Sequence, residues 1–564
     1  MTPAMPTPKK QYGQRRRVKV KAEQGYVQRR QPDTDNHLKL RAICVMGVLT
    51  LCFSAIGTKL GHVALAPPQE PRTSVHRIPQ QPTIRGNILD ANGTIIATSL
   101  KVHSIYADPQ RILNPQETAA KLANVLPHTD VSQLASRLSR QNRRFIWIER
   151  HVTPAQAFAV NGLGLPGVGF REEYVRMYPH KRLAAHVVGA TNIDGKGLAG
   201  IERSYNTHLK QGKDVQLTLD MRLQHQLTEA LRTTYADSEA KSAWGLALDA
   251  RTGAIRAMAS LPDFNPNNYG QARQQSKFNP VTFGRYEMGS TFKLFTLAQG
   301  LAEGHITPET VIDARKPITI GKYTIRDYHA KKRELTALEV LRYSSNIGAA
   351  KIAEMFGQEA QKQFFYDLGL LSPLNIHLPE TVAPDYPPIW RKVHLYTAAF
   401  GHGIAVTPVH MAAATAVLST DGQYRTPHVV KNRDLPPPRP VIDTAAVEQV
   451  KTLMEDVVQN GSGRRAQVAG LHIGGKTGTA EKVGVGGYSE DKNLVSFIAT
   501  VPLDDPQLIL LVMVNEPKHG YHTGGLAAAP AVQQLVKRAA PLLQMAPTPP
   551  TKEDITHVAY GPAE

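Results

Sequence analysis

The sequence predicts an α/β protein with a single N-terminal transmembrane helix, a first folded domain of mixed structure, and a larger domain with an antiparallel sheet flanked by helices. Three observations carry this prediction. An uncharged apolar run occupies residues 42–58, a Pro- and Gln-rich stretch follows at 67–84, and apolar strand-like runs stand at both ends of the later half with helical segments between them. A chain of 564 residues is also too long for one core.

The N-terminal tail is basic and polar. Residues 1–41 hold 11 Lys or Arg against 3 Asp or Glu, and residues 1–37 should be disordered. The formal charge of +19 is therefore uneven, and it needs no nucleic-acid partner. We expect residues 42–62 to be an uncleaved anchor with the tail in the cytoplasm, because cations precede the span. A signal peptide cleaved after the Ala-Leu-Ala at 64–66 is the alternative.

The first folded domain is expected at residues 67–215. Asn92-Gly93 lies between two apolar runs, which predicts a β-hairpin, and the charged stretch at 115–160 is expected to be helical with a solvated face. The two cysteines, Cys44 and Cys52, both lie in the apolar run, so no disulfide or thiolate metal site can form after it. No metal-binding motif such as HExxH is present either, and we expect no metal.

The second domain is expected at residues 216–545, followed by a mobile tail at 546–564. A strand end and an amphipathic helix are predicted at 216–231, two strands around an Arg-Thr-Gly turn at 244–260, and a hairpin at 495–517. Strands at both ends of the domain, with helices between, predict an antiparallel sheet covered by helices.

Ser290 and Lys293 stand three residues apart at the start of an apolar, helix-like run that ends near Gly300. This spacing is just under one helical turn, so the hydroxyl and the amine emerge on the same face. Burial disfavours the charged form of a lysine. A neutral amine beside a serine can act as the base that makes the hydroxyl a nucleophile.

Ser-x-x-Lys is a common pattern, and the chain contains two further matches. Ser238 with Lys241 and Ser489 with Lys492 lie in polar stretches that no apolar helix follows, so we expect both pairs to be solvated surface. Ser290 differs because Ser344-Ser345-Asn346 and then Lys476-Thr477-Gly478-Thr479 follow it. These three motifs in this order resemble those of penicillin-binding proteins and serine β-lactamases.

The resemblance extends through the first folded domain. Residues 85–99 are similar to the box that opens the pedestal of class B penicillin-binding proteins, with Ala91 where that family has arginine. Residues 176–192 and 197–209 resemble the second pedestal box and the Gly-x-x-Gly-x-Glu segment near its end. The chain as a whole is most similar to class B enzymes of the cell-division type.

The resemblance implies a role for each motif residue. Ser290 would be the nucleophile and Lys293 its base, a role that is disputed among related enzymes. Ser344 would relay a proton to the leaving amine, and Asn346 would hold Lys293 and the substrate amide. Lys476 would supply a fixed positive charge, Thr477 and Thr479 would bind the substrate carboxylate, and Gly478 would leave room for the substrate. The backbone N–H groups of Ser290 and Thr479 would hold the oxyanion.

The implied function is D-Ala-D-Ala transpeptidation of peptidoglycan stem peptides during septal wall synthesis, with inhibition by β-lactams and no cofactor. The implied location is the inner membrane, with a periplasmic catalytic domain. Implied partners are the products of the lipid-linked precursor, a polytopic glycosyltransferase and other division proteins. Alternatives on the same serine are a carboxypeptidase or β-lactamase, or a lateral-wall transpeptidase, and a non-enzymatic sensor or scaffold is also open.

A nucleotide-binding alternative rests on GLHIGGKT at residues 470–477, which matches the P-loop pattern. A P-loop needs a buried strand before it and a helix after it. The flanking sequences are polar on one side and glycine-rich on the other. The sequence around the pattern therefore disfavours a nucleotide-binding site.

Overall fold

The computed structural model describes residues 34–65, 84–321, 323–431, 434–484, 487–545 and 547. Within these ranges, residues 34–38, 62–65, 481–484 and 487–492 are described by their backbone alone. Its first helix, α1 (Thr34–Leu65), contains Lys39–Gly61, which is long and apolar enough to cross a membrane once. Residues 34–37 are helical, so the predicted disorder is wrong there. The rest of the predicted tail, residues 67–83 of the linker, and the C-terminal tail except Pro547 lie outside the described residues.

The pedestal contains a five-stranded sheet in the order β3-β2-β1-β7, with β4 also paired to β2. Its strands are β1 (Ile88–Leu89), β2 (Ile95–Ala107), β3 (Ile146–Val152), β4 (Val168–Met177) and β7 (Val215–Gln216). The predicted hairpin is confirmed, because β1 and β2 pair antiparallel around Gly93, whose φ of +86° suits glycine. The domain limits given above remain predictions. At the expected limit, β7 pairs in parallel with β1.

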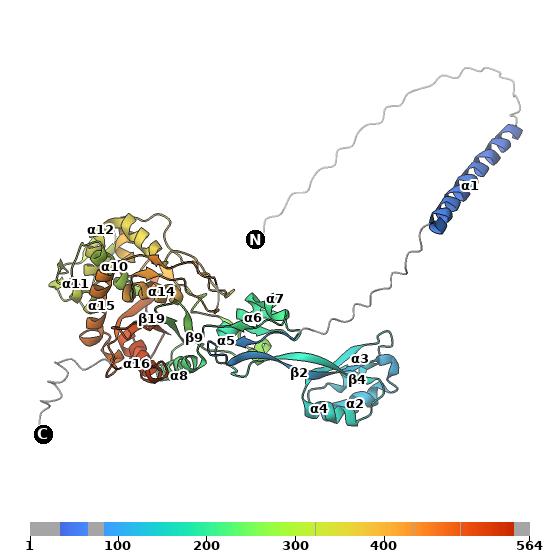
Figure 1. Ribbon diagram of the computed structural model, residues 1–564, viewed down its shortest axis with the longest axis horizontal. Helices are drawn as coiled ribbons and strands as arrows, with labels where there is room; N and C mark the ends of the chain where they lie inside the picture. Colours follow the sequence, from blue (N-terminus) through green and yellow to red (C-terminus); the bar gives the residue numbers. More distant parts are fainter. Residues whose placement is uncertain are drawn as a thin grey trace, which may run out of the picture. The chain divides into compact units, whose positions relative to one another are not determined.

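Helices and one strand make up the charged stretch of the pedestal (Figure 1). Asn114, Asp130 and Thr153 each accept a backbone N–H at the start of a helix. These helices are α2 (Pro115–Val125), α3 (Val131–Leu138) and α4 (Pro154–Gly162). The helical prediction is wrong for residues 146–152, which form β3, because they pair antiparallel with β2 and bury both ends of the strand.

Short elements complete the pedestal between β4 and β7. They are α5 (Ala185–Val188), β5 (Ala190–Thr191), β6 (Gly197–Ala199), α6 (Gly200–Ser204) and α7 (Asn206–Lys210), and the 3₁₀ turn η1 (Pro109–Arg111) lies earlier in the chain.

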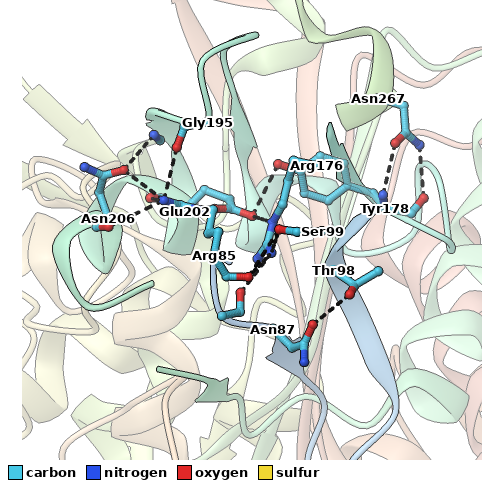
Figure 2. Close-up of polar contacts among 12 residues, drawn as sticks. Arg85, Asn87, Thr98, Ser99, Arg176, Tyr178, Gly195, Glu202, Asn206 and Asn267 are labelled. Carbon is cyan, nitrogen blue, oxygen red and sulfur yellow. Dashed lines mark hydrogen bonds and ion pairs between the residues drawn. The ribbon is translucent and has the colours of Figure 1, made fainter. Parts of the chain in front are cut away.

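A buried ion-pair cluster joins three distant segments of the pedestal (Figure 2). Glu202 is fully buried, and its carboxylate accepts from Arg85 Nε at 2.7 Å and from Arg176 Nε at 2.6 Å. Arg176 also donates to the carbonyl of Gly86 at 2.8 Å. The three residues come from the three segments that resemble the pedestal boxes of class B enzymes. Buried charges require partners of this kind, so the cluster fixes how these segments meet.

The C-terminal domain contains a five-stranded sheet in the order β18-β19-β20-β8-β9, with every neighbouring pair antiparallel. Its strands are β8 (Ser242–Asp249), β9 (Ile255–Leu261), β18 (Gly474–Gly484), β19 (Gly487–Val501) and β20 (Leu508–Asn515). Both predicted strand pairs, around residues 250–254 and 502–507, are confirmed. The sheet has β18 at one edge and β9 at the other.

Both faces of this sheet are covered. Along β20, Leu510 and Val512 pack in a cluster with residues of α8 (Met221–Asp237) and α16 (Gly524–Leu542). Leu511 and Met513 pack in a second cluster, with residues of α10 (Lys293–Ala302), α14 (Pro408–Ser419) and α15 (Thr444–Gln459). Successive side chains of a strand point to opposite faces, so a strand buried on both faces is apolar throughout. The predicted fold class is confirmed.

The remaining elements of the C-terminal domain lie outside the five-stranded sheet. The helices are α9 (Gln274–Lys277), α11 (Ala337–Arg342), α12 (Asn346–Asp367) and α13 (Lys392–Ala398), with the 3₁₀ turns η2 (Pro266–Gln271), η3 (Gly289–Phe292) and η4 (Arg464–Ala466). Two-stranded pairs are formed by β10 (Tyr286–Glu287) with β15 (Ala405–Val406), β11 (Val311–Asp313) with β14 (Glu334–Thr336), β12 (Ile318–Ile320) with β13 (Tyr323–Ile325), and β16 (Gln423–Tyr424) with β17 (Arg439–Pro440).

Candidate active site

Ser290 lies in η3, one turn before α10, and Lys293 is the first residue of that helix. The Lys293 Nζ lies 2.9 Å from the Ser290 Oγ, so the two groups share a hydrogen bond. Lys293 is fully buried, in contrast to the partly exposed Ser290. The predicted juxtaposition of hydroxyl and amine on one helical face is therefore present.

Gly289 allows the serine turn to approach strand β18. It has a φ of +52°, and a Cβ added there would lie 2.6 Å from the carbonyl oxygen of Thr479. Any larger residue would strain the backbone and push the strand away. This glycine brings the nucleophile next to the sheet edge that carries the Lys-Thr-Gly-Thr motif.

Ser344 connects the two lysines. The Lys293 Nζ lies 2.7 Å from the Ser344 carbonyl oxygen and 3.0 Å from its Oγ, and the Lys476 Nζ lies 3.1 Å from the same Oγ. Ser344 has a φ of +59°, a conformation that costs a non-glycine residue about 1–3 kcal/mol. In this conformation both of its oxygens face the amines. A continuous chain of hydrogen bonds thus runs from Ser290 through Lys293 and Ser344 to Lys476.

Neighbouring backbone and side chains hold Ser344 in place. The Asp327 carboxylate accepts from the Ser345 Oγ at 2.7 Å and from the Ile347 N–H at 2.9 Å. The Asn346 amide donates to the carbonyl oxygen of Arg326 at 2.9 Å. Within the described part of the chain, Lys293 forms hydrogen bonds with Ser290 and Ser344 and none with Asn346. The contact of Asn346 with Lys293 and its role towards substrate stay predictions.

Burial controls the charge of both lysines. Burial lowers the pKa of Lys293 well below its usual value, the charge of Lys476 lowers it further, and the Asp327 carboxylate opposes both. Lys293 is therefore suited to be neutral and to accept a proton. Burial also lowers the pKa of Lys476 to about 7. The fixed positive charge of Lys476 stays a prediction, and burial makes that charge sensitive to pH near neutrality.

The Lys-Thr-Gly-Thr residues lie on β18, at the sheet edge beside η3. Lys476 and Thr477 are buried, and Thr479 is exposed. A Cβ at Gly478 would lie 2.3 Å from the Ser496 Oγ and 3.0 Å from the Met288 carbonyl oxygen. Gly478 therefore leaves room for Ser496 of β19 and for the protein's own serine turn, and the room for substrate stays a prediction.

Two side chains of the site were not predicted from the sequence. Asp327 orients the Ser345 side chain, and the Ser462 Oγ lies 2.6 Å from the Thr477 Oγ1. Neither belongs to a motif, and no spacing marks them. Only the folded structure reveals them, because Asp327 and Ser462 are 18 and 15 positions along the chain from the residues they contact.

Neither the Ser238 pair nor the P-loop pattern forms a site. Ser238 is fully buried, so its predicted exposure is wrong, and its Oγ donates to the Thr234 carbonyl oxygen at 2.6 Å near the end of α8. The side chains of Ser489 and Lys492 lie outside the described residues. Lys476 and Thr477 lie within a strand and not in a loop that leads into a helix, so the P-loop interpretation is wrong.

The pKa of Lys476 predicts a pH dependence of acylation by penicillin. Raising the pH through about 7 removes the Lys476 charge. The second-order rate constant, which reports ionisations of the free enzyme, should fall about tenfold between about pH 6 and pH 8.5. Stopped-flow measurements with a fluorescent penicillin test this. Its methyl ester, which has no carboxylate to bind, is the control and should lack the fall. A penicillin profile flat through this window would contradict the prediction.

Replacing Ser462 by alanine should weaken recognition at Thr477. The Ser462 hydroxyl holds the Thr477 hydroxyl at 2.6 Å, and a hydrogen bond of this type contributes about 0.5–1.5 kcal/mol. We expect the second-order acylation rate constant to fall by roughly 2- to 12-fold, with a small fall in the melting temperature. Ser462→Thr retains a hydroxyl and should recover most of the loss. Equal losses in both variants would argue that the hydroxyl is not involved.

Comparison with known proteins agrees with this geometry. The model of the penicillin-binding protein transpeptidase domain matches residues 244–537, and that of the penicillin-binding protein dimerisation domain matches residues 80–224. The probable peptidoglycan D,D-transpeptidase FtsI of Caulobacter vibrioides is 35% identical over 536 residues, which cover 91% of this chain and 90% of the relative. The peptidoglycan D,D-transpeptidase FtsI of Escherichia coli K12 is 30% identical over 544 residues, covering 89% and 92%.

Solved structures show the same fold. Penicillin-binding protein 3 of Mycobacterium tuberculosis, in complex with aztreonam, matches with a TM-score of 0.68 at 22% identity, over 83% of this chain and 98% of that one. The family models together span the pedestal and the C-terminal domain, in the order expected for class B enzymes. The chain therefore belongs to the penicillin-binding protein family, as a class B member in which a dimerisation domain precedes the transpeptidase domain.

Proposed function

We propose that this protein is a peptidoglycan D,D-transpeptidase of the FtsI type, which cross-links stem peptides during septal wall synthesis and is acylated by β-lactams at Ser290. The observation that carries the proposal is the chain of hydrogen bonds from Ser290 through Lys293 and Ser344 to Lys476. The named activity of the two FtsI relatives supports the substrate and the reaction.

In the acylation step, neutral Lys293 takes the hydroxyl proton of Ser290 as the Oγ attacks the carbonyl carbon between the two D-Ala residues. The backbone N–H groups of Ser290 and Thr479 stabilise the oxyanion. The C–N bond then breaks, and the leaving amine receives a proton from the Ser344 hydroxyl. Lys293, 3.0 Å from that hydroxyl, returns the proton to Ser344. The products are a serine ester and free D-Ala.

In the second step, the amine of an acceptor stem peptide attacks the ester carbonyl. The same hydroxyl and amine carry its proton back, so that Ser290 leaves as a neutral alcohol and a new peptide bond remains. Before D-Ala leaves in the acylation step, Lys476, Thr477 and Thr479 bind the terminal carboxylate of the donor. This carboxylate favours the charged form of Lys476, because an opposite charge raises the pKa of a lysine. Asn346 hydrogen-bonds the substrate amide.

The experiment that tests this function is intact-mass analysis of the full chain after incubation with a penicillin, followed by peptide mapping. A stable adduct on Ser290 is expected, because a transpeptidase cannot release the penicilloyl group to water at an appreciable rate. Rapid release of hydrolysed penicillin would assign a β-lactamase. Absence of any adduct would indicate a non-enzymatic scaffold. Release of D-Ala from a stem peptide without cross-linked product in the presence of acceptor would assign a carboxypeptidase.

The location follows from the charge of the tail. The 11 Lys or Arg residues at 1–41 precede the apolar helix, so the positive-inside rule places them in the cytoplasm and the catalytic domain in the periplasm of the inner membrane. A polytopic glycosyltransferase and other division proteins are the proposed partners, in contact with α1 and the pedestal. Protease protection of the tail in sealed inner-membrane vesicles tests the orientation.

A further inference from the structure

A cavity of about 640 Å³ lies between the pedestal and the C-terminal domain. Its walls come from the α5 to α6 region of the pedestal, from β8 and β9 of the sheet, and from the loops that follow β9. Strand β9 forms the edge of the sheet opposite β18, so the cavity is separate from the candidate active site. Small-molecule sites in proteins commonly occupy about 300–1,000 Å³ and prefer domain interfaces.

Aromatic rings line much of this cavity. Trp244 and Tyr286 are stacked with ring centroids 5.1 Å apart. Phe278 and Phe283 pack edge to face at 6.0 Å and are 44% and 45% exposed, although both are large apolar side chains. Flat rings pack favourably against such surfaces. The shape and chemistry of the wall therefore favour a planar, aromatic occupant.

Two buried polar atoms in the wall lack a protein partner. Trp244 and Ser260 are neighbours across β8 and β9, and they are 2% and 4% exposed. Among the described residues, neither the Trp244 Nε1 nor the Ser260 Oγ has a hydrogen-bond partner. Leaving such groups unsatisfied costs about 1–3 kcal/mol each. Both atoms are shielded from solvent, so they mark unsatisfied polar groups in the wall and do not by themselves specify the occupant.

The charges at the cavity favour an anion. Lys277 places its Nζ 4.4 Å from the ring centroid of Tyr269, and Arg203 also lines the cavity. The one carboxylic acid in the lining, Glu380, lies within 3.3 Å of the Gly200 N–H, and burial raises its pKa. Two cations thus line the cavity with one acid, whose charged form is disfavoured by burial. An acidic substituent on the occupant would gain from this balance.

We propose that this cavity binds a planar aromatic anion, such as an aryl carboxylate or sulfonate, at a site distinct from the one that contains Ser290. The ring stacks among Trp244, Tyr286, Phe278 and Phe283, and the acidic group faces Lys277. Because Tyr286 lies four residues before Ser290, a bound ring contacts the segment that leads to the nucleophile. The proposal is independent of the transpeptidase reaction, since none of these residues belongs to the motifs.

The probe is naphthalene-2-sulfonate, titrated by calorimetry into the full chain in lipid nanodiscs, with empty nanodiscs as the blank. We expect one binding site per chain. Phe278→Ala combined with Phe283→Ala should weaken binding about tenfold, because each aromatic contact contributes about 0.5–1.5 kcal/mol. Lys277→Glu should weaken it comparably. The side chains of Phe278, Phe283 and Lys277, which form the rim of the cavity, are partly exposed, so the variants should remain folded.

Two controls make the outcome decisive. Phe158→Ala removes a phenylalanine that is 82% exposed on α4 of the pedestal, and it should leave binding unchanged. Prior acylation of the protein with penicillin should also leave binding unchanged, because Ser290 is outside the cavity. Loss of probe binding after acylation would place the probe in the active site and overturn the proposal. So would no saturable binding, or an affinity insensitive to the three rim substitutions.

Discussion

Replacement of Ser290 by alanine is expected to abolish covalent labelling by penicillin and to leave the fold unchanged. The Ser290 Oγ is the only hydroxyl within hydrogen-bond distance of Lys293 besides that of Ser344, among the described residues. Without it, no ester can form at this position. Loss of the nucleophile of a serine enzyme typically costs at least about 10³-fold in rate. Gel fluorescence with a fluorescent penicillin, together with circular dichroism, measures both parts of the prediction.

Ser238→Ala is the matched control for this variant. Ser238 also precedes a lysine by three residues, but it only donates to the Thr234 carbonyl oxygen. We expect labelling to persist in Ser238→Ala, with at most a modest loss of stability. Undiminished labelling of Ser290→Ala at another residue would refute the assignment of the nucleophile. A variant that fails to fold would be recognised from its spectrum, and Ser290→Cys would then test the same atom position with a different nucleophile.

Removal of the Glu202 carboxylate is expected to destabilise the pedestal by about 3–5 kcal/mol. Glu202 is fully buried and is paired with both Arg85 and Arg176 (Figure 2). In Glu202→Ala the two guanidinium groups would remain buried with like charges and no counter-ion. Breaking a buried pair in this way is far more costly than breaking an exposed one. Urea unfolding of the full chain, followed by fluorescence, measures the difference.

Glu172→Ala is the control within the same domain. Glu172 pairs with Lys101 on the surface, where the two side chains are 60% and 55% exposed. Its removal should cost less than about 1 kcal/mol. Similar stabilities of the two variants would mean that the cluster does not hold the three segments together. Retention of penicillin labelling in a folded Glu202→Ala protein would in addition separate the structural role of the pedestal from the chemistry at Ser290.

Much of the architecture could be predicted from local patterns. The apolar run at residues 42–58 predicts a membrane-spanning helix because a helix there needs no polar partner. Asn92-Gly93 predicts the turn between β1 and β2, and the apolar runs on either side of the Arg-Thr-Gly turn at 244–260 predict β8 and β9. Strand β3 was missed, since its residues pair with β2 some forty positions earlier in the chain. Local composition carries no information about such a partner.

The sequence by itself determined the order of the three motifs, the spacing of Ser290 and Lys293, and the family. Covalent spacing places a serine and a lysine on one helical turn without help from distant residues. Only the tertiary structure decided that Ser344 bridges Lys293 and Lys476, that Gly478 makes room for Ser496 and the serine turn, and that burial makes the charge of Lys476 sensitive to pH. The contacts of Ser344 join residues 51 and 132 positions away in the chain, and the pH sensitivity depends on exclusion of water. Both arise only when the chain is packed.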